Sequence, residues 1–135
     1  MERKKIICYT DGSFKKIFKR KIGGTGIYIP SLNIKIGYSY NQGVKNSNNM
    51  EKQSIYDVFK LLLKMKKGYL YSNSSKYNFI IYNDNKKIVK EINKEKQIYD
   101  RKINLNFIKI IWSSRDKKGI KEADKIATKY RKLME

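Results

Sequence analysis

The segment "IICYTDGSF", residues 6–14, decides the fold and raises the first question about function. Four residues of strand-forming type are followed at once by Thr10, Asp11, Gly12 and Ser13. An Asp-Gly pair is a common turn former, so Asp11 could simply close the strand. It could also hold a carboxylate at the edge of a sheet for chemistry. The rest of the chain has to separate these two interpretations.

The composition predicts one folded domain spanning residues 1–135, with 40% hydrophobic and 33% charged residues. No run of 18 apolar residues is present, so we expect no membrane span. The single cysteine, Cys8, excludes an intramolecular disulfide and favours a reducing, cytoplasmic location. Its place within a strand pattern predicts a small buried side chain.

The charge is the strongest bulk feature, because 32 Lys and Arg face 12 Asp and Glu, a net charge of +20. Such a charge favours a polyanionic partner, above all nucleic acid. Two alternatives could explain this charge. Codon bias could enrich lysine without any functional reason, and, as a weaker alternative, a basic helix could bind a membrane surface. The chain has no histidine, which excludes Ser-His and Cys-His catalysis and His-ligated zinc.

Hydrophobic periodicity predicts a mixed α/β chain with the order β-β-β-α-β-α-β-α. The first three strands are expected to form an antiparallel meander, and the two later crossovers favour parallel pairing. The basic segment 14–21, "FKKIFKRK", is expected as a turn, and Gly68 as the stop of the first helix. The result is a five-stranded mixed sheet flanked by helices, with strands at 4–11, 22–30, 32–40, 76–84 and 106–112 and helices at 48–67, 85–99 and 120–134.

Four carboxylates stand where these elements begin or end: Asp11, Glu51, Asp84 and Asp124. Each has a structural alternative. Asp11 could form a turn, Glu51 could complete a capping box with Asn48, Asp84 could cap the next helix, and Asp124 could be solvated. Asp124 borders the apolar stripe of its helix, however, and Asp84 ends a buried strand where ligands of such sheets gather.

Clustered carboxylates on so basic a chain suggest a metal site. Mg²⁺ prefers oxygen ligands, and carboxylates that crowd together without a cation repel one another. Two ions about 4 Å apart can activate a water and stabilise the leaving oxygen of a phosphodiester. Basic flanks would hold the nucleic acid while the acidic pocket holds the metal.

Four segments in this order and spacing resemble type 1 ribonuclease H, over nearly the whole chain: "YTDGS" at 9–13, "SNNMEKQSIYDVFKLL" at 47–62, "IIYNDNKKIV" at 80–89 and "IIWSSRDKKGIKEADKIATK" at 110–129. The resemblance implies a ribonuclease H-like fold and cleavage of the RNA strand of RNA–DNA hybrids with two Mg²⁺ or Mn²⁺ ions. It further implies 3′-hydroxyl and 5′-phosphate products, and no small-molecule cofactor. We expect a monomer.

Carried over from the family, Asp11, Glu51, Asp84 and Asp124 are expected to bind the metal ions and to catalyse cleavage. Asp11 would contact both ions, and Glu51 would also accept a hydrogen bond from the RNA 2′-hydroxyl or the attacking water. The expected substrate-binding residues are Gly12, Ser13, Ser47, Asn48, Asn49, Asn85 and Arg115. Reading RNA through its 2′-hydroxyl agrees with the general rule that separates it from DNA.

The chain departs from many members of the family. The loop before the last helix, "SSRDKKG", lacks the histidine often found there, and Arg115 in it fits an archaeal and bacterial subgroup. Segment 97–105 is too short for the basic protrusion that some members use. The basic segment 14–21 could compensate for it, or could be a solvated hairpin loop.

Two other functions stay open at this point. The chain could be a catalytically weak or inactive nucleic-acid-binding module on the same fold. It could also be another nuclease of the superfamily, such as a junction resolvase or an integrase-like enzyme. Intact carboxylates count against the first alternative, and "SNNME" at the start of the long helix counts against the second.

Overall fold

The structure is a computed structural model, and it describes residues 4–67, 77–103 and 108–135. The elements follow the predicted order β-β-β-α-β-α-β-α: β1 (Lys4–Ile17), β2 (Arg20–Ile29), a 3₁₀ turn (Pro30–Leu32), β3 (Ile34–Tyr40), α1 (Ser47–Lys67), β4 (Tyr77–Asn83), α2 (Lys86–Ile103), β5 (Ile108–Trp112) and α3 (Lys118–Lys132). The predicted stop at Gly68 and the end of segment 97–105 lie outside the described residues.

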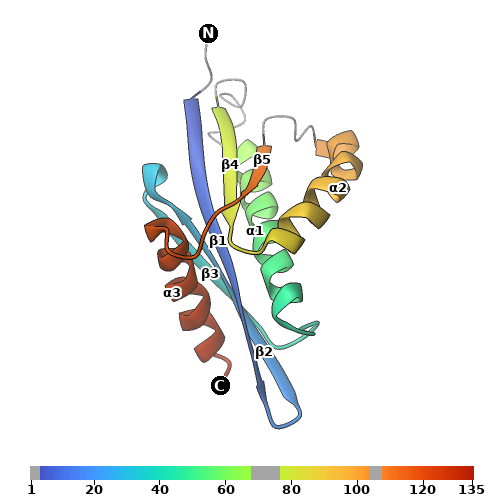
Figure 1. The fold of residues 1–135 in the computed structure, drawn as a ribbon, viewed down its shortest axis with the longest axis vertical. Helices are drawn as coiled ribbons and strands as arrows, with labels where there is room; N and C mark the ends of the chain where they lie inside the picture. Colours follow the sequence, from blue (N-terminus) through green and yellow to red (C-terminus); the bar gives the residue numbers. More distant parts are fainter. Residues whose placement is uncertain (1–3, 68–76, 104–107) are drawn as a thin grey trace.

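The five strands form one mixed sheet in the order β3-β2-β1-β4-β5 (Figure 1). β1, β2 and β3 pair antiparallel, whereas β4 runs parallel to β1 and β5 parallel to β4. The predicted mixed sheet is therefore confirmed. Pairing of β1 with β4 reaches Tyr9, opposite Tyr82, and β4 ends at Asn83. Beyond that point the edge of β1 is open, and Asp11 lies level with Asp84.

The first strand is longer than the sequence predicts. β1 continues through Asp11 to Ile17, and residues 14–17 pair with 20–23 of β2. The prediction of a basic turn at 14–21 was therefore wrong, because most of this segment belongs to the two strands of a hairpin, β1 up to Ile17 and β2 from Arg20. Charged side chains can point to solvent while their backbone groups form the hydrogen bonds of a β-ladder. Pairing with β2 therefore extends β1 through residues 14–17, although their sequence shows no clear alternation of polar and apolar residues. Asp11 stands within a strand rather than at its end.

The main core lies between the sheet and the helices α1 and α2. The apolar residues Ile55, Val58, Phe59 and Leu62 of α1 are buried there, against side chains of every strand except β3, which contributes a partly buried Ile34. Cys8 is fully buried, as predicted. Within the described residues, no helix has both the length and the apolar composition that crossing a membrane requires.

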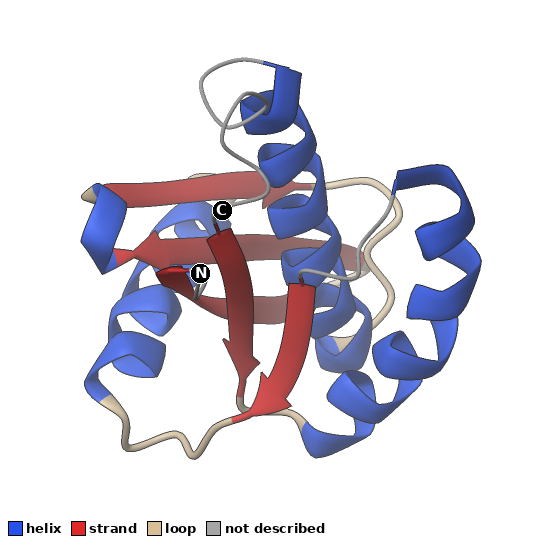
Figure 2. Ribbon diagram, turned by 90° about the horizontal axis from the view of Figure 1, so that it is seen from above, coloured by secondary structure: helices blue, strands red, loops and turns tan. Residues whose placement is uncertain are grey.

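Helix α3 covers the opposite face of the sheet, so that helices lie on both sides of it (Figure 2). The approach is close because β2 presents glycine to the helix. A Cβ added at Gly26 would lie 2.7 Å from the backbone nitrogen of Ala127 and closer still to the carbonyl of Ala123. Ala123 and Ala127 are themselves fully buried. Small residues on both sides thus set the position of α3, which carries Asp124.

Gly26→Ala is expected to destabilise the fold, because its methyl group meets rigid helix backbone rather than a movable side chain. Overpacking of this kind costs about 1–3 kcal/mol. Urea unfolding of the variant and the wild type measures the difference in the free energy of unfolding. A variant as stable as the wild type would contradict the tight packing of α3 on β2.

Candidate active site

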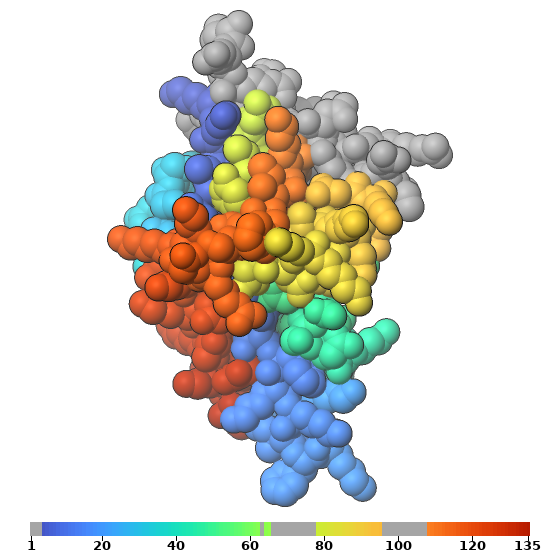
Figure 3. Space-filling model, viewed as in Figure 1, coloured from blue at the N-terminus to red at the C-terminus, as the bar shows by residue number. Residues whose placement is uncertain are grey.

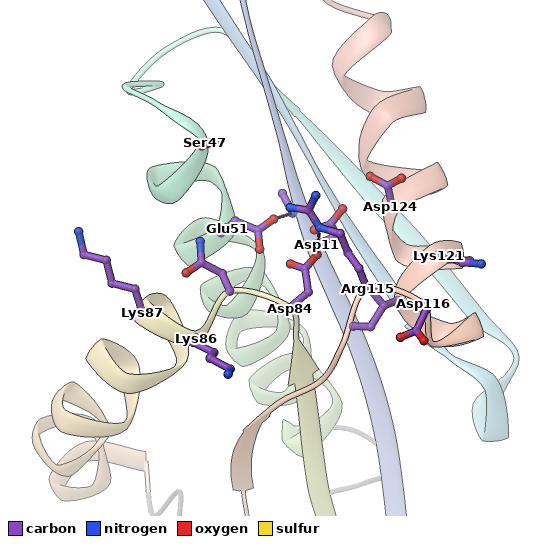
Figure 4. A pocket seen from close by; sticks show the side chains of 13 residues that line it. Asp11, Ser47, Glu51, Asp84, Lys86, Lys87, Arg115, Asp116, Lys121 and Asp124 are labelled. Atoms are coloured by element: carbon purple, nitrogen blue, oxygen red, sulfur yellow. Dashed lines mark hydrogen bonds and ion pairs between the residues drawn. The ribbon is translucent and has the colours of Figure 1, made fainter.

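Three carboxylates converge at the open edge of β1. Asp11 on β1, Glu51 on α1 and Asp84 after β4 each offer an oxygen atom, and these three atoms lie within 4.8 Å of one another (Figure 4). Asp11 and Glu51 are each only 6% exposed, and the side chain of Asp84 is 8% exposed. Three elements far apart in the sequence therefore bring three acids into one partly enclosed site.

Gly12 makes the approach of α1 possible. A Cβ at Gly12 would overlap the backbone of Met50 and Glu51, so only glycine lets the helix lie so close to β1. Its backbone N–H donates a hydrogen bond of 2.6 Å to Glu51 Oε1. Asp11 precedes Gly12 and points to the other face of the sheet. The two acids meet because β4 has already ended and no strand separates them.

Capping does not explain Glu51 or Asp84. The side chain of Asn46 accepts a hydrogen bond from the N–H of Asn49 and caps α1, so the predicted capping box of Asn48 and Glu51 is absent. Asn85 caps α2, accepting from the N–H of Ile88 at 3.1 Å. The structural alternatives for Glu51 and Asp84 were therefore wrong, and both carboxylates are left facing the site.

Asn83 is a buried residue that the sequence reasoning missed. Its amide nitrogen donates to Thr10 Oγ1 at 3.1 Å, and its Oδ1 accepts from the N–H of Asn85 at 2.9 Å. It thus fixes the residues next to Asp11 and Asp84. The signal was present as "YNDN" after a buried strand, but a polar residue beside an acid resembled ordinary loop sequence.

The electrostatics of the cluster call for a cation. Burial, and then the nearby carboxylates of Glu51, Asp124 and Asp84, raise the pKa of Asp11. Burial also raises the pKa of Glu51, against the lowering effect of its hydrogen bonds. Glu51 Oε2 is buried without a hydrogen-bond partner. A free lone pair, two buried acids and a third beside them fit a divalent metal with oxygen ligands.

Asp124 reaches the site from the other side of the cleft. It lies on α3 and is exposed, and it is not one of the three acids whose oxygens lie within 4.8 Å of one another. Its carboxylate is near enough to raise the pKa of Asp11, and it lines the same cleft. The predicted fourth carboxylate thus lies at the wall of the site rather than in its centre.

Arg115 lies over the carboxylate cluster. Its Nε donates a hydrogen bond of 3.0 Å to Asp84 Oδ2, while 89% of its side chain is exposed. The indole N–H of Trp112 donates to the backbone carbonyl of Asp84 at 3.1 Å and holds that residue in place. The exposed guanidinium group can therefore turn to another anion without any change in the core.

The cleft around these residues has a volume of about 830 Å³. It is lined by acids at its floor and by basic residues at its rim, among them Lys86, Lys87 and Lys121 (Figure 4). The sequence reasoning did not single out these three lysines, because nothing in their local sequence sets them apart from 32 basic residues.

Of the predicted substrate-binding residues, four line this cleft: Gly12, Ser47, Asn85 and Arg115. The other three are not among its described lining residues. Ser13 Oγ accepts a hydrogen bond from Arg131, and Asn48 Oδ1 accepts one from the amide of Asn85. Asn49 Oδ1 accepts the backbone N–H of Lys45. The first contact joins α3 to β1, and the other two hold the start of α1.

No family model and no curated protein matches this chain in sequence. Solved structures do match it. LC11-RNase H1, isolated from compost by a metagenomic approach, has a TM-score of 0.69 and 17% identity over 96% of this chain and 97% of that one. The same protein in complex with an RNA/DNA hybrid has a TM-score of 0.67 and 15% identity, over 96% of this chain and 98% of that one. RNase H1 from the archaeon Halobacterium salinarum has a TM-score of 0.54 and 12% identity, over 93% of this chain and 96% of that one. Identities this low show the fold alone, and that fold is the ribonuclease H fold.

Proposed function

We propose that this chain is an endoribonuclease that cleaves the RNA strand of RNA–DNA hybrids with two Mg²⁺ or Mn²⁺ ions. One observation carries the proposal: Asp11, Glu51 and Asp84 converge with a buried, unpaired Glu51 oxygen on a chain of net charge +20. A site kept only for binding a polyanion has no use for two buried acids and a third beside them, because carboxylates repel phosphate. The likeness to a hybrid-bound ribonuclease H supports the same substrate.

Asp11, Glu51, Asp84 and Asp124 would hold the ions, with Asp11 at the centre. Bound there, the ions would activate a water molecule and stabilise the leaving oxygen. Glu51 Oε1 is fixed by the N–H of Gly12, so Oε2 is oriented for an ion, a water molecule or an RNA 2′-hydroxyl. The chain has no histidine, and these carboxylates are the groups available to orient the attacking water.

The basic rim would bind the phosphates of the hybrid. Lys86, Lys87 and Lys121 stand around the acidic floor, and Arg115 is exposed above it. Asn48 and Asn85 are joined by a hydrogen bond and present amides beside the cleft. We further propose that residues 1–135 act as one domain and a monomer in the cytoplasm, without a small-molecule cofactor.

The chemistry of the products tests the proposal. A hybrid with labelled RNA should yield fragments with 3′-hydroxyl and 5′-phosphate ends, because water attacks the phosphorus and the 2′-hydroxyl does not. A ligase should then rejoin the fragments on their DNA complement. Cyclic 2′,3′-phosphate ends would contradict the proposed hydrolysis, since they arise when the 2′-hydroxyl is the nucleophile.

Arg115→Ala is expected to raise the KM for the hybrid about fivefold to tenfold, since one exposed charged contact contributes about 1–1.4 kcal/mol. The kcat should change less than about twofold, because the carboxylates stay in place. Arg115→Lys should recover part of the loss by keeping the charge. Steady-state kinetics separate the two constants. A fall in kcat at unchanged KM would show that Arg115 acts on Asp84 and not on the substrate.

A further inference from the structure

The hairpin formed by the end of β1 and the start of β2 projects beyond the helices (Figures 1 and 3). We call residues 14–21 the basic arm. Their sequence is "FKKIFKRK", and the last paired residues are Ile17 and Arg20. The arm has no share in the cleft described above. It continues the strand that carries Asp11, so it is joined rigidly to the candidate active site.

The face of the arm toward α3 is braced by the protein itself. Lys15 Nζ lies 3.4 Å from a carboxylate oxygen of Glu135, and Arg20 donates a hydrogen bond to the carbonyl oxygen of Met134. Arg131 of α3 donates to Ser13 Oγ at 3.1 Å just before the arm begins. These contacts hold the arm in place and partly neutralise this face.

The other face of the arm carries uncompensated charge. Lys16 pairs directly with Lys21 across the two strands, and both side chains are exposed. Like charges in this position destabilise a hairpin. Among the residues that the structure describes, no acid forms an ion pair with Lys16, Lys19 or Lys21. An external anion would relieve this repulsion.

Phe18 occupies the tip of the arm. The residue is 94% exposed, and its backbone φ is 56°, a conformation that favours glycine. Two-residue hairpin turns with positive φ at the first position usually place glycine there. A large apolar ring is therefore held in solvent, at a position that costs backbone energy. The fold itself gains nothing from this ring.

The length of the arm sets its reach. Ile17 lies six positions after Asp11 within β1, and a strand rises about 3.3 Å per residue, which gives about 20 Å. The phosphates of one strand of a duplex follow at about 3.4 Å. The tip can thus meet a duplex about six nucleotides from a bond held at Asp11.

We propose that the basic arm is a second nucleic-acid contact, which grips the duplex that flanks the cleavage site. Lys16, Lys19 and Lys21 bind phosphates, and the Phe18 ring packs against sugar or base edges. This inference rests on the proposed function, because the register of the duplex is set by Asp11. The rigid link to Asp11 and the basic rim of the cleft favour nucleic acid over an anionic membrane as the partner.

Two variants test the arm without harming the fold. Lys16→Gln with Lys21→Gln removes two like charges that face each other, and Phe18→Gly removes the ring while satisfying the positive φ. Both should melt at or above the wild-type temperature. Lys60→Gln with Lys64→Gln is a matched control, because it removes two exposed lysines from one face of α1, outside the cleft and the arm.

The substrate is a duplex in which a short central run of ribonucleotides fixes the position of cleavage. Its DNA flanks are either about four base pairs long, shorter than the estimated reach of the arm, or about twelve base pairs long, which exceeds it. With long flanks, each arm variant should raise KM about fivefold. The double lysine variant should also reduce the slope of log KM against log salt by about two, since each phosphate contact contributes about 0.9. With short flanks, the arm variants and the control should match the wild type.

Three outcomes would overturn the inference. First, the arm variants could have the wild-type KM for the duplex with long flanks. Second, their KM could rise by the same factor for long and for short flanks. Third, binding to anionic lipid vesicles could fall in Phe18→Gly while KM for long flanks is unchanged, which would assign the arm to a membrane. If the wild type cleaves neither duplex, the proposed function is wrong and the inference fails with it. If the wild type cleaves both duplexes but the effect of the arm variants on KM does not depend on flank length, only the inference about the arm is wrong.

Discussion

Asp11→Asn is expected to reduce cleavage of an RNA–DNA hybrid by at least about a thousandfold. Asp11 is buried, and the carboxylates of Glu51, Asp84 and Asp124 all lie near enough to raise its pKa, so it is the acid that the proposed ions would share. Loss of several kcal/mol of charge stabilisation in the transition state corresponds to this factor. The affinity for the hybrid should be preserved, because the basic rim and the basic arm are unchanged. Single-turnover cleavage and a binding titration measure the two effects.

Asp116→Asn is the matched control for this substitution. Asp116 lies in the same loop as Arg115, is exposed, and accepts a hydrogen bond from the Ser114 hydroxyl, outside the carboxylate cluster. The same chemical change there should leave cleavage within about twofold of the wild type, because one exposed charge contributes little. Equal losses in the two variants would mean that the cleft responds to total charge and not to a metal site.

Mg²⁺ or Mn²⁺ is expected to raise the melting temperature of the wild type by roughly 8 °C. At about a hundredfold excess over the dissociation constant, a ligand that binds only the folded state stabilises it by about 2.7 kcal/mol. For a chain of this length, this stabilisation corresponds to the shift given above. The shift should be lost in Asp11→Asn. Thermal unfolding with each metal, and with a chelator, is the measurement.

The metal-free protein should lose stability as the pH rises. The pKa values of Asp11 and Glu51 are raised in the folded state, mainly by burial. Their contribution to stability is therefore full below the unfolded pKa of about 4 and declines as the pH rises toward the folded values. Asp11→Asn should melt a few degrees higher than the wild type at neutral pH without metal. A lower melting temperature of the variant would contradict the repulsion on which the metal site rests.

The order of the elements could be predicted because each core element carries a strong period. The stripe of α1 repeats at helical spacing, and Ile6 and Cys8 alternate with partly exposed residues. The position of Asp84 followed from the end of a buried strand. The three central acids, together with Asp124, could be singled out among twelve because each stands where a predicted element begins or ends.

The close approach of the elements could not be predicted from the sequence. That Gly12 admits the backbone of α1, or Gly26 that of α3, depends on helix positions set by distant residues. The extension of β1 to Ile17 depends on the partner strand, whose backbone completes the ladder regardless of the charged side chains. Asn83 binds Thr10 on the neighbouring strand β1 and Asn85 in its own segment, and only the pairing of β1 with β4 reveals the first of these contacts.

Cleavage of labelled RNA in an RNA–DNA hybrid, measured beside single-stranded RNA, duplex RNA and duplex DNA, decides whether this chain is a hybrid-specific ribonuclease. Mg²⁺ or Mn²⁺ is expected to support rapid cleavage of the RNA in the hybrid, and a chelator is expected to stop it. Single-stranded RNA and duplex DNA should stay intact under the same conditions. Equal cleavage of single-stranded RNA, or cleavage that survives both the chelator and Asp11→Asn, would rule out a metal-dependent, hybrid-specific ribonuclease.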